Sequence, residues 1–374
     1  MKGWRLIMNE VNLYIHIPFC KKKCFYCDFI SYPNKDDYIE EYIDTVIKEY
    51  SNYKAEEYII KTVYIGGGTP SYIDSKYIVK LLKEINLEKA DEITIEINPG
   101  TVTKEKLINY KNSGINRLSI GLQATQDTLL KEIGRIHTYN EFLNTYNMAR
   151  DIGFKNINID LMLGLPKQTL EDIIRSVKKI IELKPEHISI YSLILEEGTK
   201  MYDMVNKQKC TLPKEDEERE MYWAVKNILE KNGYNHYEIS NFAKNGYYSK
   251  HNIDCWNQKE YIGIGVAAHS YLNNRRYSNL GNIEEYIKKY NDKEIHEIQD
   301  KISQEKEYMI LGLRKLEGVY ISEFELKFNE NPIYLFRNEL NKLVNLELIE
   351  IDLNNIRLTD KGLDLANIVW EEFI

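Results

Sequence analysis

Runs of apolar, β-branched residues alternate with helical patterns along roughly the first two hundred residues of the chain. Six of these runs predict strands, several of them apolar on both faces: Val11–Ile17, Thr62–Ile65, Glu92–Ile97, Arg117–Leu122, Asn156–Leu163 and His187–Leu195. The segments between them predict helices at about Asp36–Tyr50, Ser75–Ile85, Lys104–Ser113, Tyr139–Ile152 and Thr169–Leu183. A repeated strand–helix order is typical of right-handed crossovers and a parallel sheet. About six such units fall short of the eight that close a complete barrel, so we predict an α/β fold with a partial (β/α)6 barrel.

The pattern changes beyond the predicted barrel. Pro213–Lys231 predicts one more helix, and a Gly- and aromatic-rich region follows it. After about residue 300, short helices precede two strands, Leu348–Leu353 and Ile356–Leu358, and Asn354-Asn355 is a hairpin turn signal between them. This order resembles a winged-helix-like α+β domain. We therefore expect three parts, which are the partial barrel over residues 1–235, a connecting segment over 236–300 and the winged-helix-like domain over 301–374.

The charge balance argues against a nucleic-acid partner. The 374 residues carry a formal net charge of −8, and residues 301–374 contain nine Lys and Arg against fourteen Asp and Glu. Because phosphate binding depends on Lys and Arg, a structural or docking role is the better interpretation of that domain, with nucleic-acid binding left as an alternative. No apolar run is long enough to span a bilayer, and residues 1–10 lack the apolar core of a signal peptide. We expect a cytoplasmic protein that is not an integral membrane protein.

Three of the five cysteines lie within eight positions, in the pattern Cys20-x3-Cys24-x2-Cys27 after the first predicted strand. An odd number of cysteines in a reducing compartment is not a disulfide framework, and such close spacing indicates a metal site. A zinc site would normally need four ligands, and no nearby His or Cys completes one. Iron–sulfur clusters are usually held by four thiolates, so three leave one iron open to a chelating amine and carboxylate. The alternative is a chance grouping of cysteines or a lost zinc site.

This cysteine loop resembles the signature of the radical S-adenosylmethionine (SAM) superfamily. Segments further along the chain resemble one branch of it, which contains oxygen-independent coproporphyrinogen III oxidase and its relative, the heme chaperone HemW. Several matches in one order are more specific than any single match. The matching segments follow the family order: Gly66-Gly67-Gly68-Thr69-Pro70, Glu96-Ile97-Asn98-Pro99, Asn116–Gln123, Gly134-Arg135-Ile136-His137, Asp160–Pro166, Glu238–Ala243 and Gly263–Ser270.

The resemblance implies two cofactors, a [4Fe-4S] cluster on the three cysteines and SAM on the open iron of that cluster. It also implies that Gly67, Gly68 and Thr69 receive the methionine end of SAM, and that Glu96 binds the ribose. The glycines follow the second predicted strand, where glycine permits close backbone approach, and Glu96 lies at the end of the third, where ligands of parallel sheets bind. The other positions that match cofactor-contacting residues of the family are Tyr14, Tyr26, Gln123, Arg135 and Asp160.

Each of these positions also has a plain structural interpretation. The glycine triplet is also typical of an ordinary loop, Glu96 of a surface carboxylate, Arg135 of an ion-pair partner, and Tyr14 of a core residue. In the family, an electron from the reduced cluster cleaves SAM to methionine and a 5′-deoxyadenosyl radical, which abstracts hydrogen from a substrate. The cofactors carry this chemistry, while the protein supplies position and exclusion of solvent. The resemblance thus implies an electron donor such as flavodoxin or ferredoxin as a partner.

Three departures favour the chaperone over the oxidase. The oxidase carries another cysteine two positions beyond the third, where this chain has Phe29, and it has a long N-terminal extension, whereas thirteen residues precede Tyr14 here. The His-Asn-x-x-Tyr-Trp motif of the chaperone corresponds to residues 251–256, although Cys255 replaces its tyrosine. Because neutral imidazole is a good axial ligand of heme iron, the resemblance makes His251 a candidate heme contact. A packed, hydrogen-bonded histidine is the alternative.

The sequence therefore predicts a cluster- and SAM-binding chaperone of the HemW type. It would bind heme as cargo and transfer it to an acceptor, which we expect to be a membrane-bound respiratory protein. The first alternative is an enzyme, either the coproporphyrinogen oxidase or another radical SAM enzyme that acts on a tetrapyrrole.

Overall fold

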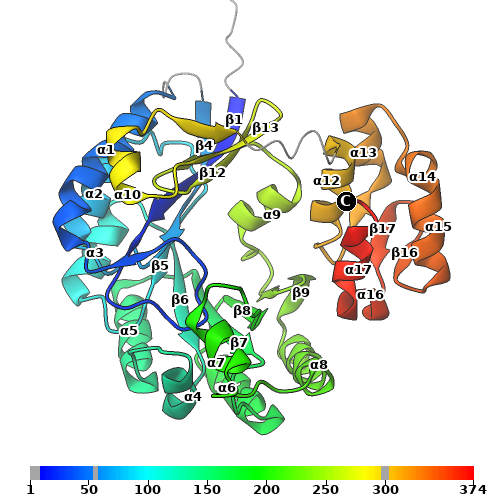
Figure 1. Cartoon of the computed structure of the whole chain (residues 1–374), viewed down its shortest axis with the longest axis horizontal. Coiled ribbons are helices and arrows are strands. Elements are labelled where there is room, and N and C mark those ends of the chain that lie inside the picture. The colour runs from blue at the N-terminus through cyan, green and yellow to red at the C-terminus, as the bar shows by residue number, and fades with distance from the viewer. Residues whose placement is uncertain (1–8, 54–57, 296–302) are drawn as a thin grey trace, which may run out of the picture.

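The computed structural model describes residues 9–53, 58–295 and 303–374, and its main feature is a sheet of twelve strands (Figure 1). Six parallel strands lie side by side in chain order at the centre of this sheet. They are β1 (Asn9–Ile17), β4 (Tyr58–Gly67), β5 (Glu92–Ile97), β6 (Arg117–Gln123), β7 (Ile157–Leu163) and β8 (His187–Ser192). The predicted α/β fold with a partial barrel of six units is confirmed.

Helices between the strands cover the outer face of the barrel (Figure 1). Two of them begin with a capping box, in which Thr138 and Thr169 exchange hydrogen bonds with Glu141 and Asp172, so that the free N–H groups of the first turn are paired. The helices are α1 (Ile39–Ser51), α2 (Ser75–Lys83), α3 (Lys104–Asn112), α4 (Asp127–Glu132), α5 (Tyr139–Ile152), α6 (Leu170–Glu182), α7 (Lys200–Asn206) and α8 (Glu215–Lys231).

The two faces of the parallel strands differ in polarity. In β1, Leu13, Ile15 and Ile17 are buried in the core cluster that the helices complete, whereas Asn12 and His16, on the alternate positions, are equally buried. The expectation of strands that are apolar on both faces is therefore wrong for the inner face. Other buried polar residues of the six strands are Thr62, Thr94, Arg117, Ser119, Asn158, His187 and Ser189. The barrel lumen is polar and can orient charged or hydrogen-bonding groups.

Residues 236–295 extend the barrel sheet at both of its edges. At one edge β11 pairs in parallel with β1 and is followed by an antiparallel meander, while at the other edge β10 pairs with β8. We expected this segment to connect two domains; the division of the chain at 235 stays a prediction, although these strands share the barrel sheet. The strands are β9 (Asn235–Glu238), β10 (Asn241–Ala243), β11 (Tyr261–Ile264), β12 (His269–Leu272), β13 (Arg275–Asn279) and β14 (Lys293–Ile295).

The same segment contains two helices, α9 (Lys250–Trp256) and α10 (Ile283–Lys288). Figure 1 shows α9 between the barrel and the C-terminal helices. The side chain of Ser249 caps the start of α9 by accepting a hydrogen bond from the N–H of Asn252. The histidine and tryptophan of the motif at residues 251–256 therefore lie on one short helix, which the sequence pattern did not predict.

The C-terminal residues pack around a second core of their own. A three-stranded sheet has the order β15–β17–β16, and β16 and β17 form the predicted hairpin, whose turn is tied by the hydrogen bond from Asp352 N to Asn355 O (3.0 Å). The elements are α12 (Gln304–Gly312), β15 (Val319–Tyr320), α13 (Ile321–Phe328), α14 (Pro332–Leu335), α15 (Arg337–Asn345), β16 (Ile349–Ile351), β17 (Asn355–Leu358), α16 (Asp360–Asp364) and α17 (Ala366–Glu371).

Two sets of contacts attach this second core to the barrel side. The backbone N–H of Leu316 donates to Tyr237 O (3.1 Å), and that of Ile239 donates to Arg314 O (3.0 Å). The buried ammonium group of Lys315 donates to Asn257 Oδ1 (2.6 Å), just beyond α9. Within the described ranges, no helix has the length and apolar character required to cross a membrane.

Candidate functional site

The three clustered cysteines lie on one loop that is closed at its base. Strand β1 leads through Pro18 into β2 (Phe19–Cys20), and β2 pairs in parallel with β3 (Tyr32–Pro33). The N–H of Tyr32 donates to Pro18 O (2.7 Å), which brings the two ends of the loop together. Within the loop the N–H of Cys27 donates to Cys24 O (3.4 Å). The fold thus holds three thiols at the carboxyl end of β1, as the spacing predicts.

The buried and partly buried thiols need a bound cationic core, such as iron–sulfur, to favour their thiolate forms. Burial raises the pKa of the Cys20 thiol, and burial with the neighbouring Cys24 raises the pKa of Cys27 to about 11. Within the described ranges, no group of three His, Cys, Asp or Glu side chains is arranged to hold one metal ion. In a cubane cluster each thiolate binds a different iron, so its ligands do not converge on one point. The thiol loop therefore fits a cluster better than a single ion.

Arg135 connects the cysteine loop to the end of β6. Its Nη1 donates to Cys24 Sγ (3.6 Å) and its Nη2 donates to Gly121 O (2.6 Å). Its Nε is buried and has no hydrogen-bond partner in the part of the chain that the structure describes. A partly buried cation with one unused donor beside a thiol is suited to an anionic cluster or ligand. Arg135 is therefore more than a surface ion-pair partner.

The glycines at the end of β4 are required largely by protein neighbours. A Cβ atom on Gly68 would lie 2.9 Å from Pro18 O and 3.0 Å from Cys20 Sγ, so glycine lets β4 approach the cysteine loop. Gly67 has φ +111°, and a Cβ atom there would meet the His16 ring. We predicted that missing side chains admit the backbone to SAM. The structure gives Gly67 and Gly68 an additional role in packing the cysteine loop.

Thr69 and Asn98 join the ends of β4 and β5 beside the cysteines. The Asn98 amide donates to Thr69 Oγ1 (2.8 Å), and this hydroxyl lies 3.4 Å from Cys20 Sγ. The backbone N–H of Asn98 also donates to Ser71 Oγ (3.0 Å). Asn98 belongs to a matched sequence segment but was not among the predicted site residues. Its position directly after a buried strand was the signal that could have identified it.

Glu96 and Asp160 place two partly buried carboxyl groups near the mouth of the barrel. Tyr64 OH donates to Glu96 Oε1 (3.0 Å), and Asn158 Nδ2 donates to Asp160 Oδ1 (2.7 Å). Burial raises the pKa of Glu96 to about 7, and the negative charge of Asp160 adds to the rise. Burial also raises the pKa of Asp160. Glu96 is thus not a surface carboxylate. Hydrogen-bond donors or cations on a ligand would stabilise its ionised form.

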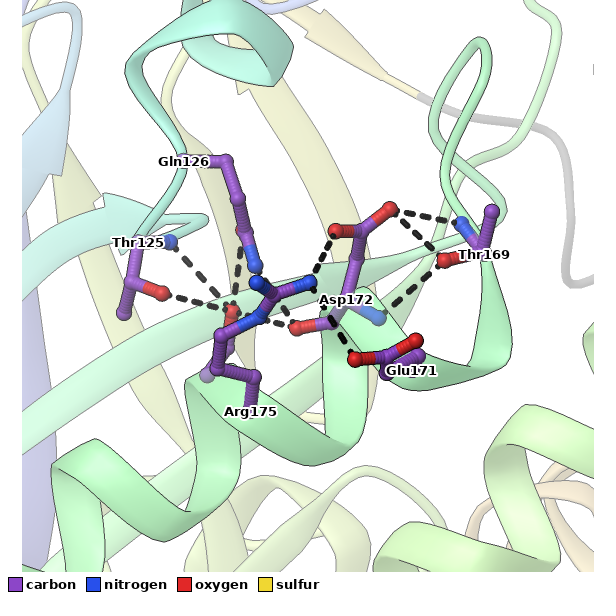
Figure 2. A network of polar contacts seen from close by, with 7 residues as sticks. Thr125, Gln126, Thr169, Glu171, Asp172 and Arg175 are labelled. Carbon is purple, nitrogen blue, oxygen red and sulfur yellow. Dashed lines mark hydrogen bonds and ion pairs between the residues drawn. The ribbon is translucent and has the colours of Figure 1, made fainter.

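Gln123 lies at an irregular position at the end of β6. Its φ is +74°, and the pairing of β6 with β7 shifts register between Gly121 and Gln123. The loop that follows is held against α6, because Gln126 Nε2 donates to Asp172 O (2.8 Å). Figure 2 shows the side chains of Thr125 and Gln126 over the capped first turn of α6. These hydrogen bonds hold the segment that directly follows Gln123 against α6.

The two predicted aromatic residues lie in different places. Tyr14 faces the lumen, where its hydroxyl lies 3.0 Å from His16 Nδ1 and its ring stacks on that of Tyr64, with centroids 6.4 Å apart. Tyr26 lies on the cysteine loop, and burial raises the pKa of its hydroxyl although the neighbouring Arg135 opposes the rise. Tyr26 therefore lies on the loop that carries the three cysteines, whereas Tyr14 contacts His16 and Tyr64 in the lumen.

His251 is not part of this group. It is buried on α9, and its Nδ1 lies 2.7 Å from Thr62 Oγ1 in the middle of β4. Thr62 lies five positions before Gly67 along β4, which corresponds to roughly 16 Å. Burial lowers the pKa of His251 to about 3, and Arg117 adds to this effect. In this arrangement heme reaches the ring only if α9 separates from β4, so the role of His251 stays a prediction.

Comparison with known proteins identifies the family. The model of the Radical SAM superfamily matches residues 14–180, and that of the HemN C-terminal domain matches residues 300–365. The heme chaperone HemW of Lactococcus lactis is 41% identical over 375 residues, which cover 99% of this chain and 98% of that protein. The chain belongs to the HemW family. The HemW of Bacillus subtilis is 38% identical, with 97% of this chain and 99% of that protein covered.

The fold is also shared with an oxidase of known structure. The solved structure of coproporphyrinogen III oxidase (HemN) from Escherichia coli superposes with a TM-score of 0.81 over 99% of this chain and 91% of that one. Its sequence identity is 23%, so this likeness concerns the fold. A HemW-family chain with this barrel belongs to the radical SAM superfamily, for which a [4Fe-4S] cluster and SAM are the expected cofactors. When bound to the three cysteines, the cluster would supply the electron for reductive cleavage of SAM.

Proposed function

We propose that this protein is a heme chaperone that holds a [4Fe-4S] cluster and SAM and transfers heme to an acceptor. The single observation that carries the proposal is the similarity to HemW proteins over the whole chain. Cys20, Cys24 and Cys27 hold the cluster, and Arg135 beside Cys24 offsets the negative charge of the cluster with its thiolates. Heme is the cargo of this function.

The SAM site lies along the carboxyl ends of the central strands. The backbone from Gly67 to Thr69 receives the methionine end, and Glu96 accepts hydrogen bonds from the ribose hydroxyls. The other contacts are supplied from the neighbouring strand ends and the cysteine loop: Tyr14, Tyr26, Gln123, Arg135 and Asp160. The support for this set is that Glu96, Asp160 and Arg135 are partly buried groups whose charges interact with one another near the barrel mouth.

The partners follow from the chemistry of the function. Reduction of the cluster needs an electron donor of the flavodoxin or ferredoxin class, and release of heme needs an acceptor protein, for which a membrane-bound respiratory protein is our proposal. We also propose that the protein acts in the cytoplasm. The acidic C-terminal domain, with nine basic and fourteen acidic residues from Lys301 onward, favours docking of a protein over nucleic acid.

Phe29 is the observation that bears on the enzymatic alternative. Its side chain is 63% exposed on the cysteine loop, and it supplies neither a metal ligand nor a hydrogen donor. Radical chemistry favours a site closed to water, whereas a cargo that must later leave favours an open one. An exposed phenylalanine beside the cluster loop suits the second case, so we place the chaperone ahead of coproporphyrinogen oxidation.

One anaerobic experiment tests this choice. Reconstituted protein is titrated with heme by absorbance and, in a parallel sample, incubated with coproporphyrinogen, SAM and a reductant. We expect heme binding and no protoporphyrinogen. Turnover of coproporphyrinogen with matching formation of 5′-deoxyadenosine would make the protein an enzyme and overturn the proposal.

The role of His251 is tested separately. His251→Ala is expected to reduce heme retention and leave the iron and sulfide content unchanged. The matched control is His236→Ala, because His236 is also a largely buried imidazole with a pKa lowered by burial to about 4, and its ring stacks on Phe242 of β10. Equal heme retention by wild type and His251→Ala would leave the chaperone function intact but reject this ligand.

A further inference from the structure

Tyr64 is a single side chain that contacts both the SAM-site carboxylate and the histidine of α9. Its hydroxyl donates to Glu96 Oε1 at 3.0 Å, and its ring lies against the imidazole of His251, with centroids 5.3 Å apart and planes inclined by 33°. The two predicted functional centres are thus joined by one partly buried residue.

Strand β5, which carries Glu96, also holds the start of α9. Glu92 begins β5, and its carboxylate accepts hydrogen bonds from the backbone N–H groups of Lys250 and His251, both at 3.2 Å. Negative charge at a helix N-terminus is stabilising. Glu92 and Glu96 lie on the same face of β5, four residues apart, because alternate residues of a strand share a face. Strand β5 therefore carries the attachment of α9 at one end and the SAM-site carboxylate at the other.

Hydrogen bonding fixes the orientation of the His251 ring. Thr62 Oγ1 donates its proton to Asn12 Oδ1 (2.7 Å), so its contact of 2.7 Å with His251 Nδ1 is made by the N–H of the imidazole. The proton on Nδ1 leaves a lone pair on Nε2, which is the form that ligates a metal. In the structure the ring is buried against Tyr64, so a ligand gains this lone pair only when α9 moves away from β4.

We infer that Tyr64 is a positioning residue that couples SAM bound at Glu96 to the docking of α9, and through it to heme bound at His251. Ribose hydroxyls and the sulfonium charge favour the carboxylate form of Glu96, and a hydrogen bond to a carboxylate is stronger than one to a neutral carboxyl group. A firmly held Tyr64 keeps its ring against His251 in a closely packed interior. SAM therefore stabilises docked α9 and weakens heme binding, and heme weakens SAM binding by the same factor.

The inference rests on the proposed binding of SAM and heme, and the test separates the two. SAM and heme affinities of wild type report on the proposed function by themselves. Hydrogen exchange of the peptide that contains α9, with and without SAM, reports on the coupling and needs no heme. We expect SAM to slow exchange in α9 of wild type, and to weaken heme binding roughly fivefold or more. Unchanged exchange in α9 at saturating SAM would overturn the inference while the proposed function stands.

The decisive variant is Tyr64→Phe, which keeps the ring against His251 and removes the hydrogen bond to Glu96. It is expected to bind each ligand alone, and to lose both the SAM effect on α9 and the mutual weakening. The matched control is Tyr234→Phe, which also removes one buried hydroxyl, the donor to Pro185 O at 2.8 Å, and should keep full coupling. Coupling that persists in Tyr64→Phe, or disappears equally in Tyr234→Phe, would refute the role of Tyr64.

A second variant keeps the inference testable if Tyr64→Phe does not fold. Thr62→Val retains the shape of residue 62 and removes the acceptor of His251 Nδ1. It therefore weakens the docking of α9 at His251, whereas Tyr64→Phe acts at Glu96. It is expected to speed exchange in α9 without SAM and to bring heme affinity in the presence of SAM closer to the affinity without SAM. Slow exchange in α9 of Thr62→Val, equal to that of wild type, would contradict the arrangement.

Discussion

The imidazole of His16 fills the space that a side chain on Gly67 would need. A Cβ atom on Gly67 would lie 2.7 Å from Cε1 and 2.8 Å from Nδ1 of His16. The ring cannot turn away easily, because its Nε2 lies 2.8 Å from Ile30 O and its Nδ1 lies 3.0 Å from Tyr14 OH. The last residue of β4 therefore packs against a buried histidine of β1, which in turn contacts the cysteine loop through Ile30.

Gly67→Ala is expected to destabilise the protein by about 2 kcal/mol or more, because it adds a clash to an unfavourable φ. Gly246→Ala is the matched control. Gly246 also has a positive φ (+85°) but has no atom within 4 Å of a built Cβ, so only the backbone strain of about 1 kcal/mol should appear. Thermal unfolding of both variants without cofactors measures the difference. Equal losses would show that the His16 contact relaxes without cost.

Removal of any one of Cys20, Cys24 and Cys27 is expected to abolish the cluster, because two thiolates do not hold a cubane. Wild type should contain about four irons per chain after anaerobic reconstitution, and each Cys→Ala variant close to none. Cys210→Ala and Cys255→Ala serve as controls, since both thiols lie outside the cysteine loop, and should keep the full iron content. Iron loss in a control variant as complete as in the triplet would reject the three-thiolate site.

SAM binding is expected to depend on the ionisation of Glu96. The pKa of Glu96 is raised by burial to about 7, so below this pH the carboxyl group must release a proton before it can accept from both ribose hydroxyls. The affinity of wild type relative to Glu96→Gln should therefore fall as the pH decreases from 8 to 6, by up to roughly tenfold per unit below 7. The ratio cancels titration of SAM itself. A ratio that is constant over this range would contradict the assignment of Glu96.

Arg314 is expected to hold the C-terminal domain against α9. Its guanidinium group lies 4.5 Å from the ring centre of Trp256 and 4.7 Å from that of Trp370. Arg314→Met keeps most of the packing and loses both cation–π contacts, which should cost about 1–3 kcal/mol and speed hydrogen exchange in α9 and α17. Arg357→Met, on an exposed ion pair with Glu350, should change neither by more than about 0.5 kcal/mol. Identical effects of both variants would refute the role of Arg314.

Local signals were sufficient to predict most of the barrel elements, although the short helices α4 and α7 were not predicted. The helical patterns at Tyr139–Ile152 and Thr169–Leu183 correspond to α5 and α6, and the β-branched runs are the six central strands. The polarity of the lumen was less evident, because Asn12 and His16 alternate with apolar residues that are equally buried. Helix α9 was missed because its seven residues are too few to produce a clear helical period.

By itself, the sequence determined the chemistry that the chain can offer: three thiols on one loop, glycines and carboxylates after strands, and a histidine in a short motif. It determined the order of strands and helices as well, because these depend on neighbours along the chain. Only the tertiary structure decided that Asn98 and Arg135 border the cysteines, that Gly67 faces His16, and that the ring of His251 packs against that of Tyr64. These relations depend on strand register and on packing between residues distant in sequence, which burial and hydrogen bonding settle together once the sheet has formed.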